Sequence, residues 1–349
     1  MRIIHLLSLL IFLAMFAIIK IPGAILWLPE CWPDLYELGD LYRFSYLPEY
    51  RDTSRHSVLE ENTESGKTNL FVLGDSFCGP FTAAHFTGVR NYSFVNWNQF
   101  PGYTVHLKTE AGFRNLVLIE CSEKHVLLRF SASERKRFLA GKGRKDQPGF
   151  QLEEKHTAWT DILEKYVGRP AVSDQNIHML LFGFEPVLAL KECKAAFFRK
   201  FFLRIAPEVE EYQNKKMLLQ RMTTDTDYLY MSSFRPLSQK KLDEIIAGIS
   251  EITSHYKQAG ADSVILSIIP NPVSVIAPRY RGRVYNRLIP RIEARIEETG
   301  AGLISVFDEF SALKEKVYRR GDTHWNEKGE RIWLQKSRKI TAEIKSHIP

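Results

Sequence analysis

NLFVLGDSFCGP, residues 69–80, is the stretch that decides the fold of this chain. A short apolar run that stops at glycine is typical of a buried strand, and residues 77–86 can then begin a helix. Ser76 is therefore expected at a strand-to-helix turn on the carboxyl edge of a parallel sheet, where open α/β sheets place their chemistry. Unpaired backbone N–H groups at the helix start would hold a developing oxyanion beside this serine.

Outward from this stretch, apolar runs and helical patterns alternate along the chain. The expected strands are residues 89–95, 116–120, 261–269 and 303–307. The expected helices are residues 237–258, residues 285–298 and a last helix, capped by Asn326, that runs to about residue 346. This alternation predicts an α/β fold with a central parallel sheet and helices on both faces.

Composition bounds the class of protein. The 349 residues, 44% of them hydrophobic, suffice for one large domain or two small ones. The net charge of +7 is spread along the chain without a zinc-finger, RNA-recognition or zipper pattern, so a solvated surface is favoured and nucleic acid is not expected as a partner. The four cysteines lack metal-ligand spacing, so neither a metal nor another cofactor is expected. For Cys78 and Cys121, two buried free thiols are favoured over a disulfide.

The beginning of the chain predicts a membrane anchor. Residues 3–19 form an almost unbroken apolar run, which as a helix would span about 26 Å. A cleaved signal peptide is the alternative, but no small-residue cleavage site follows the run. Arg2 before the run, with Glu30 and Asp34 after it, orients the chain with its bulk outside. We therefore expect a single-pass anchor at 1–28 in a bacterial cytoplasmic membrane, with the catalytic domain on the periplasmic or extracellular side.

The rest of the chain divides into a linker and one catalytic domain. Residues 29–66 contain several prolines and polar residues and are predicted to form a juxtamembrane linker. Residues 67–349 form the predicted domain, with an insertion of helical and irregular segments at about 141–233. Within the insertion, residues 195–205 read AAFFRKFFLRI. A helix packed by its phenylalanine face is the favoured interpretation, and docking on a membrane surface is the alternative.

A serine nucleophile needs a base, and the matching stretch lies near the other end of the chain. Residues 321–326 read GDTHWN. In an extended segment, residues two apart point the same way, so Asp322 and His324 can reach one site together. These residues predict a Ser76–His324–Asp322 constellation. Taken singly, Ser76 can be a helix cap and His324 a surface or core histidine, so the hypothesis rests on their combination and order.

The GDS turn and the later DTHW stretch resemble the SGNH (GDSL) hydrolase superfamily, and more narrowly its alginate O-acetyltransferase branch. Residues 119–124 (IECSEK) and 268–271 (IIPN) also fit that branch, and the resemblance runs from about residue 67 to residue 345. It implies a three-layer α/β fold and a Ser-His-Asp triad that works through an acyl-enzyme without a cofactor. It also implies a polysaccharide acceptor and a separate multi-pass membrane O-acyltransferase that supplies acetyl groups.

The chain departs from the superfamily pattern after the third expected strand. An Asn of the oxyanion hole should lie there, but residues 121–125 read CSEKH. Gly102 resembles the superfamily glycine that donates a backbone N–H to the oxyanion, and Lys124 would supply a cation in place of the Asn. Trp325, beside the histidine, would offer a face for a sugar ring, with core packing as the alternative.

Three functions follow from this reading. The favoured one is a membrane-anchored O-acetyltransferase that modifies an extracellular or cell-wall polysaccharide, because of the DTHW spacing and the anchor. The first alternative is a carbohydrate esterase or deacetylase with the same triad. The second is a non-catalytic polysaccharide-binding assembly component, against which the intact Ser76, Asp322 and His324 argue.

Overall fold

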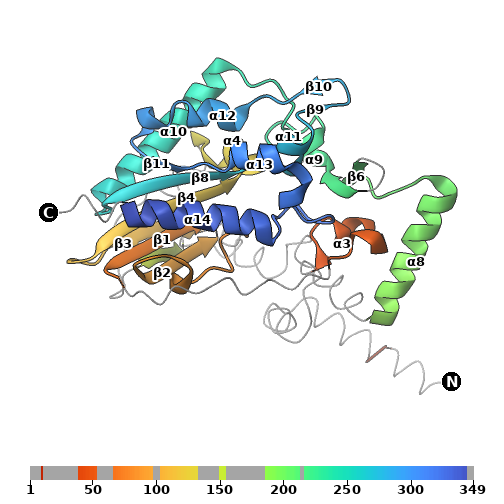
Figure 1. Ribbon diagram of the computed structural model, residues 1–349, viewed down its shortest axis with the longest axis horizontal. Helices are drawn as coiled ribbons and strands as arrows, with labels where there is room; N and C mark the ends of the chain where they lie inside the picture. The colour runs from red at the N-terminus through yellow and green to blue at the C-terminus, as the bar shows by residue number, and fades with distance from the viewer. Residues whose placement is uncertain are drawn as a thin grey trace. The chain divides into compact units, whose positions relative to one another are not determined.

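The computed structural model describes residues 9–10, 38–52, 66–96, 103–132, 149–154, 185–212 and 216–343 (Figure 1). The chain divides into two compact units. Unit 1 comprises Met1–Thr53, His156–Leu218 and Arg320–Asp322. Unit 2 comprises Ser54–Lys155, Leu219–Arg319 and Thr323–Pro349. Unit 2 holds the predicted central sheet.

The sheet of unit 2 has five strands in the order β11-β8-β4-β1-β2. The strands are β1 (Thr68–Gly74), β2 (Val89–Asn96), β4 (Arg114–Ser122), β8 (Ser263–Ile269) and β11 (Gly302–Ile304). All four pairings are parallel, which confirms the predicted sheet. Every residue of β1 and of β4 is buried, as expected where helices cover both faces of a parallel sheet.

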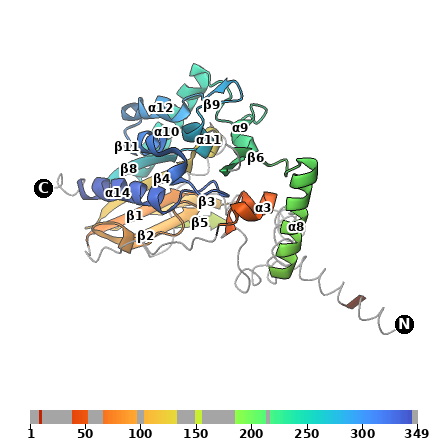
Figure 2. The same ribbon diagram turned by 45° about the vertical axis from the view of Figure 1, so that its right-hand side comes forward.

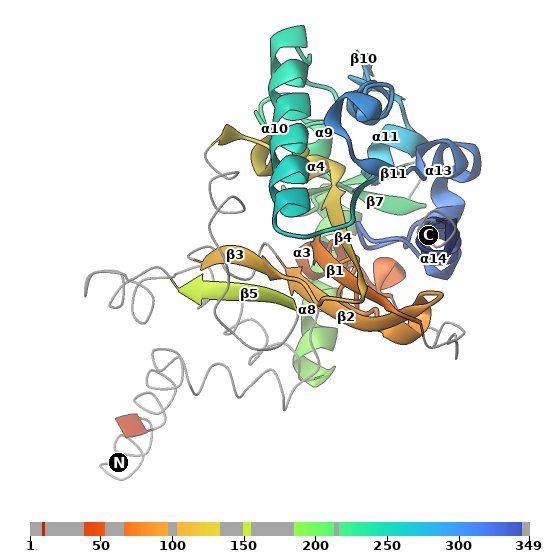
Figure 3. The ribbon, with the colours of Figure 1, turned by 90° about the vertical axis from the view of Figure 1, so that its left-hand side faces the viewer.

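Helices α10 (Gln239–Gln258) and α14 (Glu327–Glu343) cover opposite faces of this sheet (Figure 3). Leu266 and Ile268 of β8 belong to the same hydrophobic core as the apolar stripe of α10. Ser267, between them, points the other way because strand side chains alternate, and its Oγ accepts a hydrogen bond of 2.9 Å from the indole Nε1 of Trp333 on α14. The sheet is thus the middle of three layers.

Side-chain caps explain where the predicted helices begin. Ser238 caps α10 by accepting a hydrogen bond from the backbone N–H of Lys241. The Oδ1 of Asn326 accepts hydrogen bonds from the second and third residues of α14, as the sequence predicts. The predicted helix at 285–298 is instead split into α12 (Leu288–Glu293) and η4 (Ile296–Thr299). It starts late because Arg287 has a left-handed backbone conformation and the side chain of Asn286 accepts a hydrogen bond from the backbone N–H of Leu288.

The helix predicted at residues 77–86 is wrong. Residues 76–80 form turns, and only η3 (Ala83–His85) is helical. Pro80 has no N–H to donate, and the backbone N–H of Phe77 is taken by the side chain of Asp75 at 3.3 Å. Ser76 therefore lies in a turn and not at the start of a helix.

Unit 2 also contains shorter elements, two pairs of which are antiparallel ribbons that the sequence did not predict. The ribbons are β3 (Tyr103–Lys108) with β5 (Gly149–Glu154), and β9 (Arg279–Tyr280) with β10 (Arg283–Val284). The short helices are α4 (Glu123–Arg129), α9 (Arg221–Thr224), α11 (Pro272–Ile276), α13 (Phe307–Leu313) and η5 (Lys314–Val317). Of these, α4 and α11 follow β4 and β8 directly.

Unit 1 is built from segments far apart in the sequence. Its elements are α3 (Tyr42–Ser45), η2 (Pro48–Tyr50), α8 (Glu185–Phe202) and β6 (Val209–Tyr212), which pairs with β7 (Met217–Gln220). Its core is formed by Leu41, Leu47, Tyr50, Val209 and Leu218. Residues of the predicted linker at 29–66 therefore belong to a hydrophobic core, which they form together with residues of the predicted insertion.

The predicted anchor at 1–28 lies outside the described residues, apart from Leu9 and Leu10, which are helical and exposed. Within the parts of the chain that the structure describes, we find no helix both long enough and apolar enough to cross a bilayer. The thiols of Cys78 and Cys121 are free and buried, as predicted, and that of Cys193 is free and exposed.

Candidate active site

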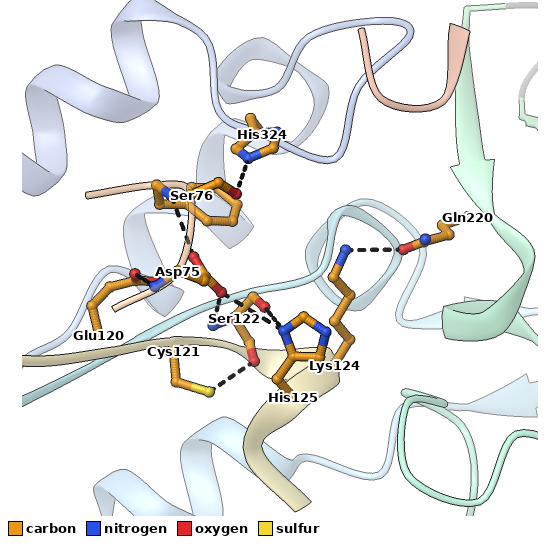
Figure 4. Close-up of polar contacts among 10 residues, drawn as sticks. Asp75, Ser76, Glu120, Cys121, Ser122, Lys124, His125, Gln220 and His324 are labelled. Carbon is orange, nitrogen blue, oxygen red and sulfur yellow. Dashed lines mark hydrogen bonds and ion pairs between the residues drawn. The ribbon is translucent and has the colours of Figure 1, made fainter. Parts of the chain in front are cut away.

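Ser76 and His324 meet at the carboxyl edge of the sheet (Figure 4). Ser76 follows the end of β1 by two residues, and its side chain is exposed. Its Oγ lies 2.7 Å from the Nε2 of His324, 248 positions later in the chain. A serine hydroxyl within hydrogen-bond reach of an imidazole is the arrangement that activates a serine as a nucleophile.

The topology of the sheet explains why this edge is open. β1 and β4 are neighbours in the sheet. After β1 the chain turns to one side, toward β2, and after β4 it turns to the other side, toward β8. Loops that leave to opposite sides create a crevice at the carboxyl ends of the strands, where α/β proteins bind ligands. Ser76 follows β1, and Ser122 and Lys124 lie at the end of β4, so all three lie at this edge.

Asp75 fixes the turn that carries Ser76. Its Oδ2 accepts a hydrogen bond of 3.0 Å from the backbone N–H of Ser122, and its Oδ1 accepts one of 3.3 Å from the backbone N–H of Phe77. Its own backbone N–H donates to the Oε2 of Glu120 at 2.9 Å. The residue before Ser76 is therefore tied to β4 through both its side chain and its backbone.

Asp75 and Glu120 are two buried carboxyl groups whose pKa values are shifted in opposite directions. Burial alone would raise the pKa of Asp75. The interactions with His125 and the hydrogen bond from Ser122 outweigh burial, so the pKa of Asp75 lies below its ordinary range. Burial and the negative charge of Asp75 raise the pKa of Glu120 well above its ordinary value. These opposite directions favour the negative charge on Asp75 over one on Glu120.

The two residues that follow Glu123 point toward polar partners. The Nζ of Lys124 donates a hydrogen bond of 3.2 Å to the Oε1 of Gln220. The Nδ1 of His125 lies 3.0 Å from the Oγ of Ser122 and 3.8 Å from the Oδ2 of Asp75. Burial lowers the pKa of His125. His125 therefore supports the turn of Asp75, whereas the oxyanion role of Lys124 stays a prediction.

His324 is held by the backbone and by an aromatic cluster. Its carbonyl oxygen accepts a hydrogen bond of 3.3 Å from the backbone N–H of Arg319. The ring of Phe77 lies 4.5 Å from the imidazole and 4.8 Å from the ring of Trp325, measured between centroids. Trp325 is only 4% exposed and also contacts Trp333, so its burial favours the packing alternative over a face for sugar stacking.

For two predicted site residues, the proposed role rests on the sequence alone. Gly102 lies outside the described residues. Asp322 is buried and belongs to unit 1, and its role as the carboxylate that orients His324 rests on the two-residue spacing in the sequence.

The sequence did not predict a third buried carboxyl at this edge, that of Glu123. The Oε2 of Glu123 accepts hydrogen bonds from the backbone N–H of Asn271 at 2.8 Å and from the hydroxyl of Ser274 at 2.6 Å. Burial raises the pKa of Glu123 to about 7. These contacts tie the end of β4 to the end of β8. The sequence did mark the two stretches involved, because IECSEK and IIPN are among those that support the resemblance. Their contact, however, cannot be inferred from either stretch alone.

Comparison with known proteins adds no identification. No protein-family model, no curated protein and no solved structure matches this chain.

Proposed function

We propose that this chain is a serine acyltransferase or ester hydrolase of the SGNH type, with Ser76 as nucleophile and His324 as general base. The observation that carries the proposal is the 2.7 Å contact between the Oγ of Ser76 and the Nε2 of His324 on an exposed turn. His324 takes the serine proton, the Oγ attacks an acyl carbonyl, and the imidazolium then protonates the leaving oxygen. Asp322 is the proposed partner that orients the imidazole.

The acyl-enzyme formed on Ser76 is resolved by an acceptor hydroxyl, which His324 deprotonates in turn. For the tetrahedral oxyanion we propose the backbone N–H groups of Ser76 and Gly102, with Lys124 as an additional cation. The ties between Asp75 and β4 support this role, because an oxyanion donor must be held in place before the charge develops.

The proposed acceptor is a hydroxyl of an extracellular or cell-wall polysaccharide, and the proposed acyl group is acetyl. A separate multi-pass membrane acyltransferase would supply that group, and residues 1–28 would anchor the enzyme in a bacterial cytoplasmic membrane with its domain outside. The support is the spacing of the DTHW stretch and the apolar run at 3–19. A carbohydrate esterase with the same catalytic residues is the second candidate, because the exposed Ser76 is open to water as an acceptor.

The nucleophile can be tested on the full chain with a fluorophosphonate probe and an acetyl-ester donor. We expect the wild type to be labelled and to release acetate, and Ser76→Ala and His324→Gln to lose at least about a thousandfold of both rates. Ser250→Ala, which changes a half-buried serine on α10, is the matched control and should keep both rates. Equal labelling and acetate release by the wild type and Ser76→Ala would contradict a catalytic serine.

Addition of an oligosaccharide acceptor separates the two reactions. Acetylated acceptor that depends on Ser76 would identify the transferase. Acetate release that depends on Ser76, without acetylated acceptor, would identify the esterase. Binding of the polysaccharide that survives Ser76→Ala, with no turnover of the donor by the wild type, would indicate the non-catalytic alternative.

A further inference from the structure

Figure 2 shows the course of α8. This helix and the residue that follows it carry an unusual group of exposed apolar side chains. The exposed fractions of the large apolar side chains here range from 37% to 90%. These residues are Leu190, Phe197, Phe198, Phe201, Phe202 and Leu203. The four phenylalanine rings contact one another, with centroids 4.8–6.1 Å apart. A helix packed by its phenylalanine face, which the sequence favours, is therefore wrong for this segment.

The other face of α8 is fixed to unit 1, which sets the direction of the exposed face. Leu188 is 2% exposed and packs with Tyr42. Glu192 accepts a hydrogen bond of 2.5 Å from the hydroxyl of Tyr42. Arg199 forms ion pairs with Glu49 and Glu211. Because these contacts hold one side of α8, the phenylalanine side remains outward.

Cations surround the exposed apolar face. The ammonium of Lys194 lies 6.0 Å from the ring of Phe198, and that of Lys200 lies 5.6 Å from the ring of Phe201. Arg204 follows within two residues of the end of the helix. Basic side chains beside exposed aromatic rings are typical of helices that lie in the interface of an anionic membrane.

A pocket of about 450 Å³ adjoins this face. Its wall includes the cations Lys191, Lys194 and Arg204, and no carboxylate is among its lining residues, all of which the structure describes. The ammonium of Lys191 lies 4.1 Å from the centre of the Tyr46 ring. Burial and the neighbouring Lys194 lower the pKa of Lys191 to about 8, so a bound anion would stabilise its charged form.

We propose that α8 is a second membrane-contact site, which docks on an anionic phospholipid bilayer. The phenylalanine and leucine side chains enter the boundary between headgroups and acyl chains. The phosphate of one lipid binds in the pocket beside Lys191, Lys194 and Arg204. This proposal is independent of the catalytic residues.

The aliphatic side chains favour a lipid surface over an anionic polysaccharide. Sugar rings stack on flat aromatic faces, but they gain little from Leu190 and Leu203, which are 70% and 90% exposed. A bilayer interface, in contrast, stabilises aromatic and aliphatic side chains together with the basic residues around them.

The length of the chain also favours a membrane. α8 packs on the segment that begins at residue 38, ten positions after the end of the predicted anchor at 28. Ten extended residues reach at most about 36 Å. The predicted anchor would therefore keep α8 close to the leaflet surface, where docking costs little further translational entropy.

Cys193 provides a native reporter of docking, because it is exposed and lies one and two turns before Phe197 and Phe201 on the same face. The full chain carrying Cys31→Ser is labelled on Cys193 with nitrobenzoxadiazole and reconstituted into phosphatidylcholine vesicles, with or without phosphatidylglycerol. Lipids that carry a nitroxide then quench the fluorophore if it enters the interface. We expect strong quenching and a blue shift with phosphatidylglycerol and weak quenching without it.

Variants on the surface of α8 test the two parts of the proposal. Each lysine is expected to contribute about fivefold to the ratio of docked to undocked α8. The double change Lys194→Glu, Lys200→Glu should therefore lower this ratio by at least about 25-fold in anionic vesicles. The double change Phe197→Gln, Phe201→Gln should abolish the blue shift.

Matched controls lie in unit 2. Leu229→Gln and Lys240→Glu change a similarly exposed leucine and an exposed lysine, and they should leave docking unchanged. A thermal-unfolding midpoint equal to that of the wild type shows that each variant is folded.

Four outcomes would overturn the proposal. One is equal quenching with and without phosphatidylglycerol, and another is no effect of either α8 double change. A blue shift that grows with protein concentration in detergent without lipid would assign the face to a second copy of the chain. Loss of docking on addition of soluble anionic polysaccharide, but not of inorganic phosphate or neutral glycan, would assign it to a polysaccharide.

Discussion

Asp75 is the residue on which the position of Ser76, the proposed nucleophile, depends most. Its two carboxylate oxygens accept hydrogen bonds from two backbone N–H groups, those of Ser122 and Phe77. Asp75→Asn keeps one oxygen and replaces the other with a donor, so one buried N–H loses its acceptor. We expect a loss of about 1–3 kcal/mol in unfolding free energy, measured by urea denaturation. We also expect kcat to fall by about a hundredfold, as a displacement of about 1 Å would cause.

Asp262→Asn is a matched control for that variant. The Oδ2 of Asp262 also accepts a backbone N–H, that of Asn115, but at the opposite edge of the sheet. This control should leave kcat unchanged, whatever its effect on stability. A kcat of Asp75→Asn equal to that of the wild type would show that the carboxylate does not position Ser76.

Glu123 predicts a dependence of stability on pH. Burial raises its folded pKa from 4.5 to about 7, so its ionised form is favoured in the unfolded chain. The contribution of Glu123 to stability is therefore lost as the pH rises from about 4.5 to about 7, and it is constant above that range. Glu123→Gln keeps an oxygen for the Asn271 N–H and the Ser274 hydroxyl and should remove this loss.

The comparison to make is the difference in unfolding free energy between wild type and Glu123→Gln, measured by urea denaturation at several pH values. We expect the difference to shift in favour of the variant between about pH 5 and pH 7 and then to level off. A difference that does not change with pH would mean that Glu123 is ionised throughout.

Individual residues differ in how far the sequence reveals them. Ser76 and His324 are visible because each lies in a short motif, and their roles need only the order of the motifs. Glu120 and Glu123 are buried acids whose partners follow other strands of the sheet, so nothing near them in the sequence marks them. Trp325 lies within a recognisable motif, but its burial could not be predicted. The rings that it contacts belong to Phe77 and Trp333, which the sequence does not place beside it.

At the scale of elements, Gly329 controls how α14 begins. A Cβ at this position would lie 2.6 Å from the carbonyl oxygen of Val317 and 2.7 Å from the Cβ of Trp325. Gly329→Ala must therefore push the start of α14 away from the segment that carries His324. We expect a loss of about 1–3 kcal/mol in unfolding free energy and a lower kcat. Urea denaturation and donor hydrolysis measure the two effects.

Gly79→Ala is the control for that change. The nearest atom to a Cβ at Gly79 is 3.6 Å away, at an ordinary contact distance. This variant should keep wild-type stability or gain up to about 1 kcal/mol, because alanine restricts the unfolded chain. If Gly329→Ala were as stable and as active as Gly79→Ala, the close packing at α14 would not control the site.

Elements were predicted well where one local pattern decides them. The five strands are marked by apolar runs, and α10 and α14 by their periodicity and caps. The stretch at 77–86 failed because its polar groups bond within the turn and with Asp75, which periodicity does not reveal. The ribbon of β3 and β5 pairs strands about 40 residues apart, and pairings of that kind need tertiary information.

At the scale of the whole molecule, unit 1 depends on residues that precede the sheet. Leu41, Leu47 and Tyr50 are at most 1% exposed and contact Val209 and Leu218. Removal of residues 1–52 should therefore destabilise unit 1, at about 1.5–3 kcal/mol for each lost buried side chain. A chain that begins at Leu38 should keep unit 1 folded.

Hydrogen exchange of the backbone amides in β6 measures this difference. We expect protection in the chain that begins at Leu38 and loss of protection in the chain that begins at Thr53. Equal protection in both would show that the early segment is dispensable. The predicted division into linker, domain and insertion did not include this packing, because the segments that form unit 1 are separated by more than 100 residues.

The separation of Ser76 and His324 along the chain determines how late during synthesis the two residues can meet. A ribosome that adds about 5–20 residues per second needs about 12–50 s to pass from Ser76, the proposed nucleophile, to His324, its proposed base. Until then the serine is synthesised but has no partner to remove its proton. On the proposed mechanism the nascent chain would thus be its own inactive precursor, and acyl transfer would become possible only when the last part of unit 2 has left the ribosome and closed against β1.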